Sequence, residues 1–519
     1  MNKMPFTVTI YRSVDEIAPH AWADIFPSVV ENYQFYKVIE KTLLTDYQFY
    51  YITIYRDSKI ICLVPAFITE FALDTTIKGP LKNFTLKLRK RFPHWLILKV
   101  FICGSPLSGG KLGVIDQDQP EIAYVLNETI SSLTKKEKIN IFAFKDFHQT
   151  YTKFLDHLLT YKFHKIHGFP FVELKIDFKS FDEYLARLSK STRKGLKKKF
   201  KLIDNQPHFE IEVRDNLGEL VDEAYQLYLN TLKKSEIQFE VLPKSFFELI
   251  ATYMPQETKF FLWKLNGKLV AFDLCLASGN QMIDEYIGLD YTVAHQYQLY
   301  FDTYRVIIQW CIANGIQSYE AGALNYDPKK RLDFAFIPQY IYTKHRNPII
   351  NIFFRFLGFI LKPENFDPVL RSMKKDSTTK KSNIGVLTFG IFWLVILSDF
   401  IESLGELFYK KAALSTGIDN IVFSNFTTFA TKIIINENLW IGISFYILNF
   451  FLWIIALSKA DLSVVYPIGS TSYIIVMILS MVFLHEHITV LRWIGVCFII
   501  LGIYFIFQST HKRENLNND

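Results

Sequence analysis

The last quarter of the chain contains four long apolar stretches, whereas the residues before it alternate apolar and polar positions in short segments. The four stretches are Val386–Tyr409, Trp440–Leu457, Leu462–Leu484 and Leu491–Phe507. Each comes close to the roughly 20 apolar residues that an α-helix needs to cross a bilayer core of about 30 Å. The pattern predicts an all-α, four-helix transmembrane domain over residues 385–510.

The clearest pattern before that domain lies in Lys259–Asp290, where three alternating apolar segments are separated by Asn266-Gly267 and Gly279-Asn280. Such residue pairs favour two-residue hairpin turns, so the run predicts an antiparallel meander. Apolar residues at helical spacing predict helices on both sides of it. The predicted helices are Leu217–Lys234, Pro243–Tyr253 and Tyr297–Ala313, and the predicted later strands are Ser318–Gly322 and Phe336–Lys344.

Composition agrees with a soluble part joined to a membrane part, because 50% of the residues are hydrophobic and yet 58 Lys and Arg and 51 Asp and Glu are present. The five cysteines are isolated, so neither a disulfide framework nor a metal site is expected. The N-terminus has no apolar signal region, and basic residues gather between Lys362 and Lys381. Both features predict a cytoplasmic N-terminal part, and four spans return the C-terminus to the same side.

Glu402 stands out because it is an acidic residue inside the first apolar stretch. A carboxylate at that depth costs at least ~2.5 kcal/mol on insertion scales unless it pairs, protonates or lines a wet cavity. The residue is therefore a candidate for transport chemistry. The alternative is that Asp399, Glu402 and Glu406, at helical spacing, lie near the membrane surface and are solvated.

A strongly basic helix is predicted between Tyr184 and Ile203, with eight Lys or Arg and no acid. Arg193, Lys194 and Lys197 belong to it. Such a density favours contact with cofactor phosphates, tRNA or the anionic inner leaflet, while a solvated face remains open. Aromatic residues are not interleaved there as in proteins that bind single strands, so neither DNA nor another nucleic acid is expected as the main partner.

Over about residues 170–350 the chain resembles the GNAT superfamily of acyltransferases, in particular its FemAB-like branch. The resemblance rests on the basic segment YLARLSKSTRKGLKKKFKLI, the strand IDEYIGLD and the stretch IQSYEAGALNYDPKKRLDFAFIPQYIYTKH. It implies an α+β fold of two GNAT-like lobes with a mixed sheet. Residues 1–170 are then a degenerate first lobe, 171–360 the acyltransferase lobe, and 361–384 a basic linker to the membrane domain.

The same resemblance implies transfer of an acyl group from acyl-CoA, or alternatively from aminoacyl-tRNA, to a primary amine. The candidate catalytic residues are Asp273, Asp284, Glu285 and Tyr286. Asp284 and Glu285 are expected on opposite faces of their strand, with Tyr286 on the face of Asp284 as a proton donor. Structural hydrogen bonds are the alternative role of these acids. Lys329, shortly after Glu320, joins Arg193, Lys194 and Lys197 as a candidate for binding the donor or its phosphates.

Residues 386–508 resemble the drug/metabolite transporter superfamily, with features of its small multidrug resistance members, EamA-type proteins and lipid-carrier flippases. The motif FIESLGELFYKKA carries Glu402, Gly405 and Lys410, and VVYPIGSTS places Tyr466 in the position of a pocket tyrosine. Gly469 stands where the drug pumps carry tryptophan. The resemblance implies a bacterial inner-membrane protein that forms a homodimer or hetero-oligomer through this domain, with Glu402 binding protons and cationic substrate in turn.

Taken together, these features predict a bifunctional protein. The N-terminal part is expected to acylate a small amine-bearing substrate, free or lipid-linked, and the C-terminal part to move the product across the lipid bilayer. The alternative is a transporter whose GNAT-like part regulates without catalysing.

Overall fold

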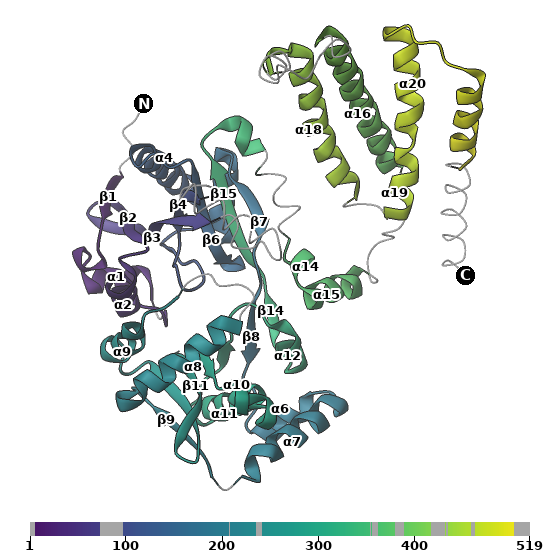
Figure 1. The fold of residues 1–519 in the computed structure, drawn as a ribbon. Helices are drawn as coiled ribbons and strands as arrows, with labels where there is room; N and C mark the ends of the chain where they lie inside the picture. Colours follow the sequence, from purple (N-terminus) through teal and green to yellow (C-terminus); the bar gives the residue numbers. More distant parts are fainter. Residues whose placement is uncertain are drawn as a thin grey trace. The chain divides into compact units, whose positions relative to one another are not determined.

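The protein is described by a computed structural model in which the chain forms two compact units, Met1–Arg371 and Ser372–Asp519 (Figure 1). The structure describes residues 6–27, 29–72, 97–206, 208–234, 241–352, 354, 362–378, 389–416, 431, 434–457 and 462–502. The ends of two predicted spans, residues 386–388 and 503–507, lie outside this set.

The first unit contains a mixed sheet in the order β1-β2-β3-β4-β6-β15-β7, with β5 paired to β3. Its strands are β1 (Thr7–Tyr11), β2 (Gln48–Arg56), β3 (Lys59–Ala72), β4 (Ile97–Cys103), β5 (Gly113–Val114), β6 (Ile141–His148), β7 (His164–His167) and β15 (Gln339–His345). β2 and β3 form an antiparallel hairpin. Asp57 and Ser58 at its turn both have positive φ, as a tight hairpin requires.

A second mixed sheet of the same unit has the order β14-β8-β13-β12-β11-β10-β9, in which only β12 and β13 pair in parallel among the described residues. Its strands are β8 (Phe171–Lys175), β9 (Phe209–Arg214), β10 (Thr258–Leu265), β11 (Lys268–Ser278), β12 (Gln281–Leu289), β13 (Ser318–Glu320) and β14 (Ala335–Ile337). The predicted meander is confirmed as β10–β12. Asn266, Gly267 and Gly279 have positive φ at its turns.

Helices cover both faces of this second sheet. They are α6 (Phe181–Arg187), α7 (Lys190–Asp204), α8 (Val221–Lys234), α9 (Lys244–Tyr253), α10 (Tyr291–Tyr297), α11 (Leu299–Ala313) and α12 (Tyr326–Arg331). The single helix predicted over Tyr297–Ala313 is wrong in one respect. Gln298 adopts left-handed φ and ψ of 56° and 39°, so the segment divides into α10 and α11.

The remaining helices of the first unit are α1 (Pro19–Ile25), α2 (Tyr33–Leu43), α4 (Pro120–Lys136), α5 (Thr152–Leu155), α14 (Pro363–Phe366) and α15 (Pro368–Thr378), the last of which crosses the boundary between the units. Short 3-10 turns lie at Val14–Glu16, Gln149–Tyr151, Asp156–Tyr161 and Gly218–Leu220. The stretch predicted as a basic linker thus contains helical turns in its described part.

One hydrophobic core joins the two lobes. It packs Trp22 and Phe35 from α1 and α2 together with Phe246 of α9 and Phe272 and Leu274 of β11. Burial of apolar area stabilises by roughly 25 cal/mol per Å², so separating the lobes would expose this core at a large cost. The lobes therefore form one body.

The strand predicted over Phe336–Lys344 is two strands rather than one. β14 pairs with β8 in the second sheet, whereas β15 pairs with β6 and β7 in the first. Pro338 separates them, and a proline has no N–H to donate to a continuous ladder. The chain thus returns to the first lobe at residue 339.

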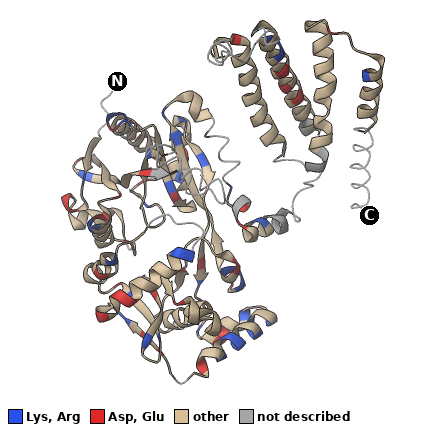
Figure 2. Ribbon diagram, in the orientation of Figure 1, with Lys and Arg blue, Asp and Glu red and all other residues tan. Residues whose placement is uncertain are grey.

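The second unit is helical, with α16 (Phe389–Thr416), α18 (Glu437–Leu457), α19 (Leu462–Gly469) and α20 (Thr471–Phe483), followed by a shorter apolar helix, Val490–Gly502. Within the described residues, two helical segments, Glu437–Leu457 and Val465–Phe483, are long and apolar enough to cross a membrane. α16 is long enough but carries several acidic residues (Figure 2).

The loop after β4 generates a prediction about stability. A Cβ added at Gly110 would lie 2.3 Å from the carbonyl oxygen of Lys145, so Gly110→Ala should lower the free energy of unfolding by about 1–3 kcal/mol through overpacking. Thermal melting of the full-length protein checks this.

The matched control is Gly195→Ala in α7, where no atom lies within 4 Å of the added Cβ. Removing a glycine from a helix interior should stabilise by about 0.5–1 kcal/mol. Equal melting temperatures for the two variants would show that the backbone at residue 110 has room for a side chain.

Candidate functional site

The candidate site lies where β12 and β13 part. Their parallel pairing runs from Gln281–Ser318 to Ile283–Glu320, and β13 ends there while β12 continues to Leu289. The residues that follow on β12 are Asp284 and Glu285. On the β13 side of β12, the backbone beside these two carboxylates is not paired with another strand.

A bulge sets the direction of these side chains. On β11, Leu274 pairs with Tyr286 and Cys275 with Asp284, so Glu285 is the extra residue of β12. Two residues opposite one break the strict alternation of side chains. Asp284 therefore shares a face with Cys275, and Glu285 is not opposed on β11.

The prediction that Tyr286 shares the face of Asp284 is wrong. Tyr286 packs against Phe246, Phe247 and Tyr228 in the core between the lobes, with ring centroids 5.8, 6.4 and 6.0 Å apart. The bulge shifts the register by one, which turns the ring to the other face. A tyrosine from a different strand takes the expected place: the Tyr319 hydroxyl donates a hydrogen bond of 2.7 Å to Asp284 Oδ2.

Asp273 and Asp284 form a close pair of acids. Their carboxylate oxygens and Cys275 Sγ all lie within 4.8 Å of one another, and Asp273 is only 1% exposed. Burial and the neighbouring Asp284 hold the pKa of Asp273 well above its usual range. Burial also raises the pKa of Asp284, although hydrogen bonds from Asp273 and Tyr319 oppose this. Two acids so close do not both ionise, so Asp273 carries the proton and Asp284 accepts from it.

Lys329 supplies a positive charge to this pair. It is 5% exposed, and its Nζ donates to the carbonyl oxygen of Ala321 at 2.5 Å. Burial lowers the pKa of Lys329 to about 8, while both aspartates raise it. Leu324 and Asn325, before α12, have positive φ, which is costly for a leucine and is typical of functional loops. The loop is bent around this ammonium group.

Two tyrosines of α11 that were not predicted as site residues lie near Asp273 and Asp284. The hydroxyls of Tyr300 and Tyr304 lie 3.1 Å apart, and the ring of Tyr304 lies 6.3 Å from that of Tyr319. Burial raises the pKa of all three hydroxyls, and the two aspartates add to this. The signal in the sequence was their spacing of four residues on the helix that follows the meander.

Glu285 takes part in a second charged cluster, which is centred on Lys111 of the first lobe. Lys111 pairs with the buried Glu31, and burial lowers its pKa while Glu320 and Glu285 raise it. Burial raises the pKa of Glu320, and Lys111 opposes this. Glu173 of β8 accepts a hydrogen bond of 2.5 Å from Ser318 close by. The first lobe thus places an ammonium group against the acids of the second.

The Gly109-Gly110 loop makes this approach possible. A Cβ at Gly109 would lie 2.8 Å from the ring of Phe171, and the backbone N–H of Gly110 donates to the carbonyl oxygen of Asp146. The glycines therefore serve close packing of the loop against β6 and β8. Lys111 follows directly and is held in place.

The predicted basic helix is α7, and Figure 2 shows its charges gathered there. Leu196, Phe200 and Ile203 are buried, whereas Lys190, Lys194, Lys197, Lys198 and Lys201 are exposed. Arg193 is half-buried and donates to the carbonyl oxygen of Ala186 at 3.3 Å. Helical spacing places the five lysines on one face.

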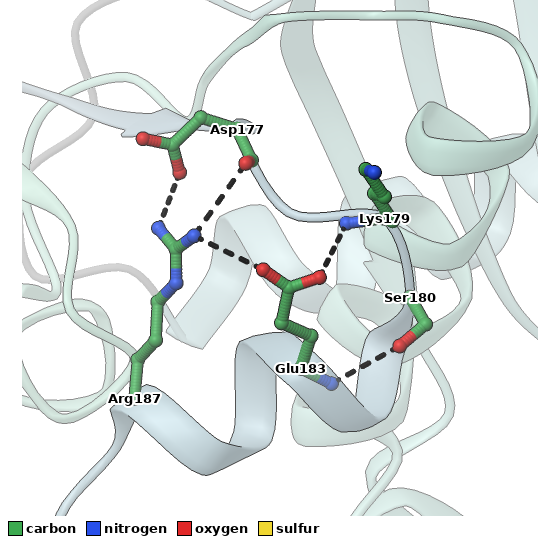
Figure 3. Close-up of polar contacts among 5 residues, drawn as sticks. All are labelled: Asp177, Lys179, Ser180, Glu183 and Arg187. Atoms are coloured by element: carbon green, nitrogen blue, oxygen red, sulfur yellow. Dashed lines mark hydrogen bonds and ion pairs between the residues drawn. The ribbon is translucent and has the colours of Figure 1, made fainter.

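The preceding helix α6 neutralises one of the eight basic residues (Figure 3). Ser180 caps α6 by accepting from the N–H of Glu183, and Glu183 accepts in return from the N–H of Lys179. Arg187 forms ion pairs with Asp177 and Glu183. The Ser180 cap fixes the start of α6, and the two ion pairs take Arg187 out of the basic surface.

In the helical unit, the three predicted transport residues lie in different surroundings. Glu402 Oε2 accepts a hydrogen bond of 3.0 Å from Asn449 of α18. Gly405 is buried against Tyr446, where small residues let α16 and α18 approach closely. Tyr466 is 61% exposed and contacts the ring of Trp453 at 5.3 Å. Asp399, one turn before Glu402, is buried, which contradicts its interpretation as a solvated acid.

Comparisons with known proteins agree with this division of the chain. A family model described as FemAB-like, peptidoglycan biosynthesis/recognition, matches residues 13–348, and the EamA-like transporter family matches residues 384–508. A putative 8-amino-7-oxononanoate synthase 2 of Mycobacterium tuberculosis (strain CDC 1551 / Oshkosh) is 23% identical over 328 residues. That alignment covers 60% of this chain but 42% of the relative, so the chain spans less than half of its length.

Two further proteins resemble one part each. The probable 4-amino-4-deoxy-L-arabinose-phosphoundecaprenol flippase subunit ArnE of Proteus mirabilis (strain HI4320) is 28% identical over 121 residues, which are 23% of this chain and 98% of that protein. A crystal structure of FemX aligns at 13% identity and a TM-score of 0.43, over 65% of this chain and 97% of that one. The chain belongs to the FemAB-like family through residues 13–348 and carries an EamA-like transporter domain at its C-terminal end.

Proposed function

We propose that this membrane protein transfers an acyl or aminoacyl group to the primary amine of a lipid-linked substrate, and that its helical domain carries that lipid across the membrane. The observation that supports the first half best is the pair of Asp273 and Asp284, with Tyr319 and Lys329, at the point where β12 and β13 part. The family match supports transfer chemistry over the same residues.

The site offers a group for each step of amide formation. Asp284 takes a proton from the amine as its nitrogen attacks the carbonyl carbon of the donor, and a C–N bond forms. The C–S or C–O bond to the donor then breaks, and the leaving group takes the proton that Asp284 accepted from the amine. Asp273 and Tyr319 hold the charge of Asp284 by hydrogen bonds. The ammonium of Lys329 stabilises the negative charge that develops on the carbonyl oxygen.

The cluster around Lys111 gives Glu285 a different role from Asp284. Glu285 and Glu320 face a positive charge from the first lobe. We infer that these acids attract the amine to the site before it loses its proton, while Asp284 acts as the base.

The donor is an acyl-CoA thioester or an aminoacyl-tRNA, both of which carry phosphates. The exposed lysines of α7, including Lys194 and Lys197, offer a positive surface to either, with Arg193 at its edge. Lys329 is buried beside the aspartates, so its ammonium group interacts with the acyl group of the donor rather than with the phosphates.

The relative of the helical domain supports a lipid-linked acceptor. The name of ArnE describes a flippase subunit for an amino sugar joined to a polyprenyl phosphate, and its match covers 98% of that protein. A substrate of this class presents an amine to the transferase and a lipid tail to the membrane. We propose four spans, a cytoplasmic N-terminal part and pairing of subunits through the helical domain.

Substitution of the base tests the enzymatic half. Asp284→Asn keeps the shape of the side chain and removes its basicity, so turnover should fall at least ~100-fold while donor binding changes little. Mass spectrometry of the acylated amine and calorimetry with each donor measure the two quantities. Asp327→Asn, an exposed acid on α12, is the control and should leave both unchanged.

No detectable acyl transfer by the wild-type protein, together with intact lipid transport in Asp284→Asn, Asp273→Asn and Glu285→Gln, would favour the alternative of a regulatory domain. Absence of binding to both donor classes would do the same.

The pH dependence of transfer should be bell-shaped. Turnover falls on the acid side as Asp284 takes up a proton, at a pH above the ordinary aspartate range because burial raises its pKa. It falls on the alkaline side near pH 8, where Lys329 loses its charge. Lys329→Arg should move the alkaline limb upward, because a guanidinium stays protonated. An unmoved alkaline limb in this variant would assign it to another group.

Transport is tested at Glu402. Glu402→Gln preserves the hydrogen bond from Asn449 and removes titration, so the protein should remain inserted and lose pH-dependent transport. Glu402→Asp should keep activity with a shifted pH profile. Reconstituted vesicles with an imposed pH gradient provide the measurement, and Glu437→Gln, an exposed acid of α18, is the control. Normal transport by Glu402→Gln at every pH would show that the residue is structural.

A further inference from the structure

Asp399 of α16 is the most shielded carboxyl group of the helical unit's described residues, with 0% of its surface exposed. The Thr471 hydroxyl, at the start of α20, donates a hydrogen bond to Asp399 Oδ2. Oδ1 accepts no hydrogen bond from any residue that the structure describes. A buried carboxylate oxygen without a partner is costly unless a cation or a donor reaches it.

The surroundings of this oxygen include an aromatic ring and a glycine. A Cβ at Gly469 would lie 3.8 Å from Asp399 Oδ1 and only 3.0 Å from the six-membered ring of Trp453. The lack of a side chain at residue 469 therefore lets the indole pack close to the carboxylate. Carboxylates and tryptophan rings are the groups that attract organic ammonium ions in proteins.

The other acids of α16 are placed differently. Glu402 is already hydrogen-bonded by Asn449, whose Oδ1 in turn accepts from Ser398. Glu406 lines a cavity of about 650 Å³ together with Lys410 on α16, and with Glu486 and Arg492 beyond α20. Asp399, Glu402 and Glu406 follow at helical spacing, so a row of acids leads from this cavity toward Asp399.

We propose that Asp399 Oδ1 binds the primary ammonium group of the transported ligand, with Trp453 beside it, Thr471 holding the other oxygen, and Gly469 letting the indole approach the carboxylate. An ammonium group has three donors and no acceptor, which suits an unpartnered carboxylate oxygen. The inference deepens the proposed transport function and rests on it. It assigns recognition of the amine to Asp399 and leaves proton exchange to Glu402.

Binding of a simple amine to the full-length protein in detergent tests this assignment. The probe is octylammonium, and N-octylacetamide is its neutral counterpart that lacks the charge. Calorimetry should show saturable binding of octylammonium and no binding of the amide beyond partitioning into detergent. Asp399→Asn keeps the size of the side chain and removes its charge, so the affinity for octylammonium should fall at least tenfold.

Gly469→Ala should also weaken octylammonium binding, roughly fivefold, because its Cβ would lie 3.0 Å from the ring of Trp453 and displace that ring from beside Oδ1. This second variant keeps the acid, so it tests the site even if Asp399→Asn folds poorly. Glu437→Gln removes an exposed acid by the same chemical change and should leave the affinity unchanged. Acyl transfer by Asp399→Asn should continue at the wild-type rate, which separates this test from that of the transferase.

Wild-type affinity in Asp399→Asn would overturn the proposal, whether or not the pH dependence of binding changed. So would a loss that Glu402→Gln shows and Asp399→Asn does not, or an equal loss in Glu437→Gln. Binding of N-octylacetamide as tight as that of octylammonium would also overturn it, because charge would then play no part.

Discussion

The bulge between β11 and β12 is the constraint on which the candidate site depends. Glu285 has no partner residue on β11, so two successive acids of β12 belong to two different clusters. Asp284 lies beside Asp273 and accepts a hydrogen bond from Tyr319, whereas Glu285 belongs to the charged cluster around Lys111. Without the extra residue the later part of β12 would slip by one position, and the ring of Tyr286 would leave the core.

The sequence predicted those features that depend on local chemistry. The turns at Asn266-Gly267 and Gly279-Asn280 define the meander, because few other residues accept positive φ there. The helices α8 and α9 follow from apolar spacing. Asp273 and Asp284, both predicted as site residues, lie close together. Lys329 was predicted to bind the donor with Arg193, Lys194 and Lys197, but it lies beside the two aspartates instead. The roles of these residues stay predictions.

Features that depend on distant contacts could not be predicted. No local pattern marks Glu285 as a bulged residue, so Tyr286 was placed on the wrong face. The spacing of Tyr300 and Tyr304 is typical of any amphipathic helix. Only the packing of α11 against β13 places them beside the acids of the site. Lys111 follows a pair of glycines, and only its packing beside the second lobe gives it the acidic neighbours Glu285 and Glu320. Asp399 was judged by its spacing from Glu402, whereas its burial comes from α19 and the start of α20.

The strand exchange between the lobes has a mechanical consequence. The chain passes from the first sheet to the second through Gly168–Pro170 and returns through Pro338 alone, since β14 ends at Ile337 and β15 begins at Gln339. Two such short connections, one of them a proline with a fixed φ, oppose rotation of one lobe against the other. They hold Lys111 and the acids of the second lobe at a nearly constant spacing. In the proposed reaction, the substrate therefore enters through movement of side chains and individual loops, not through opening and closing of the two lobes.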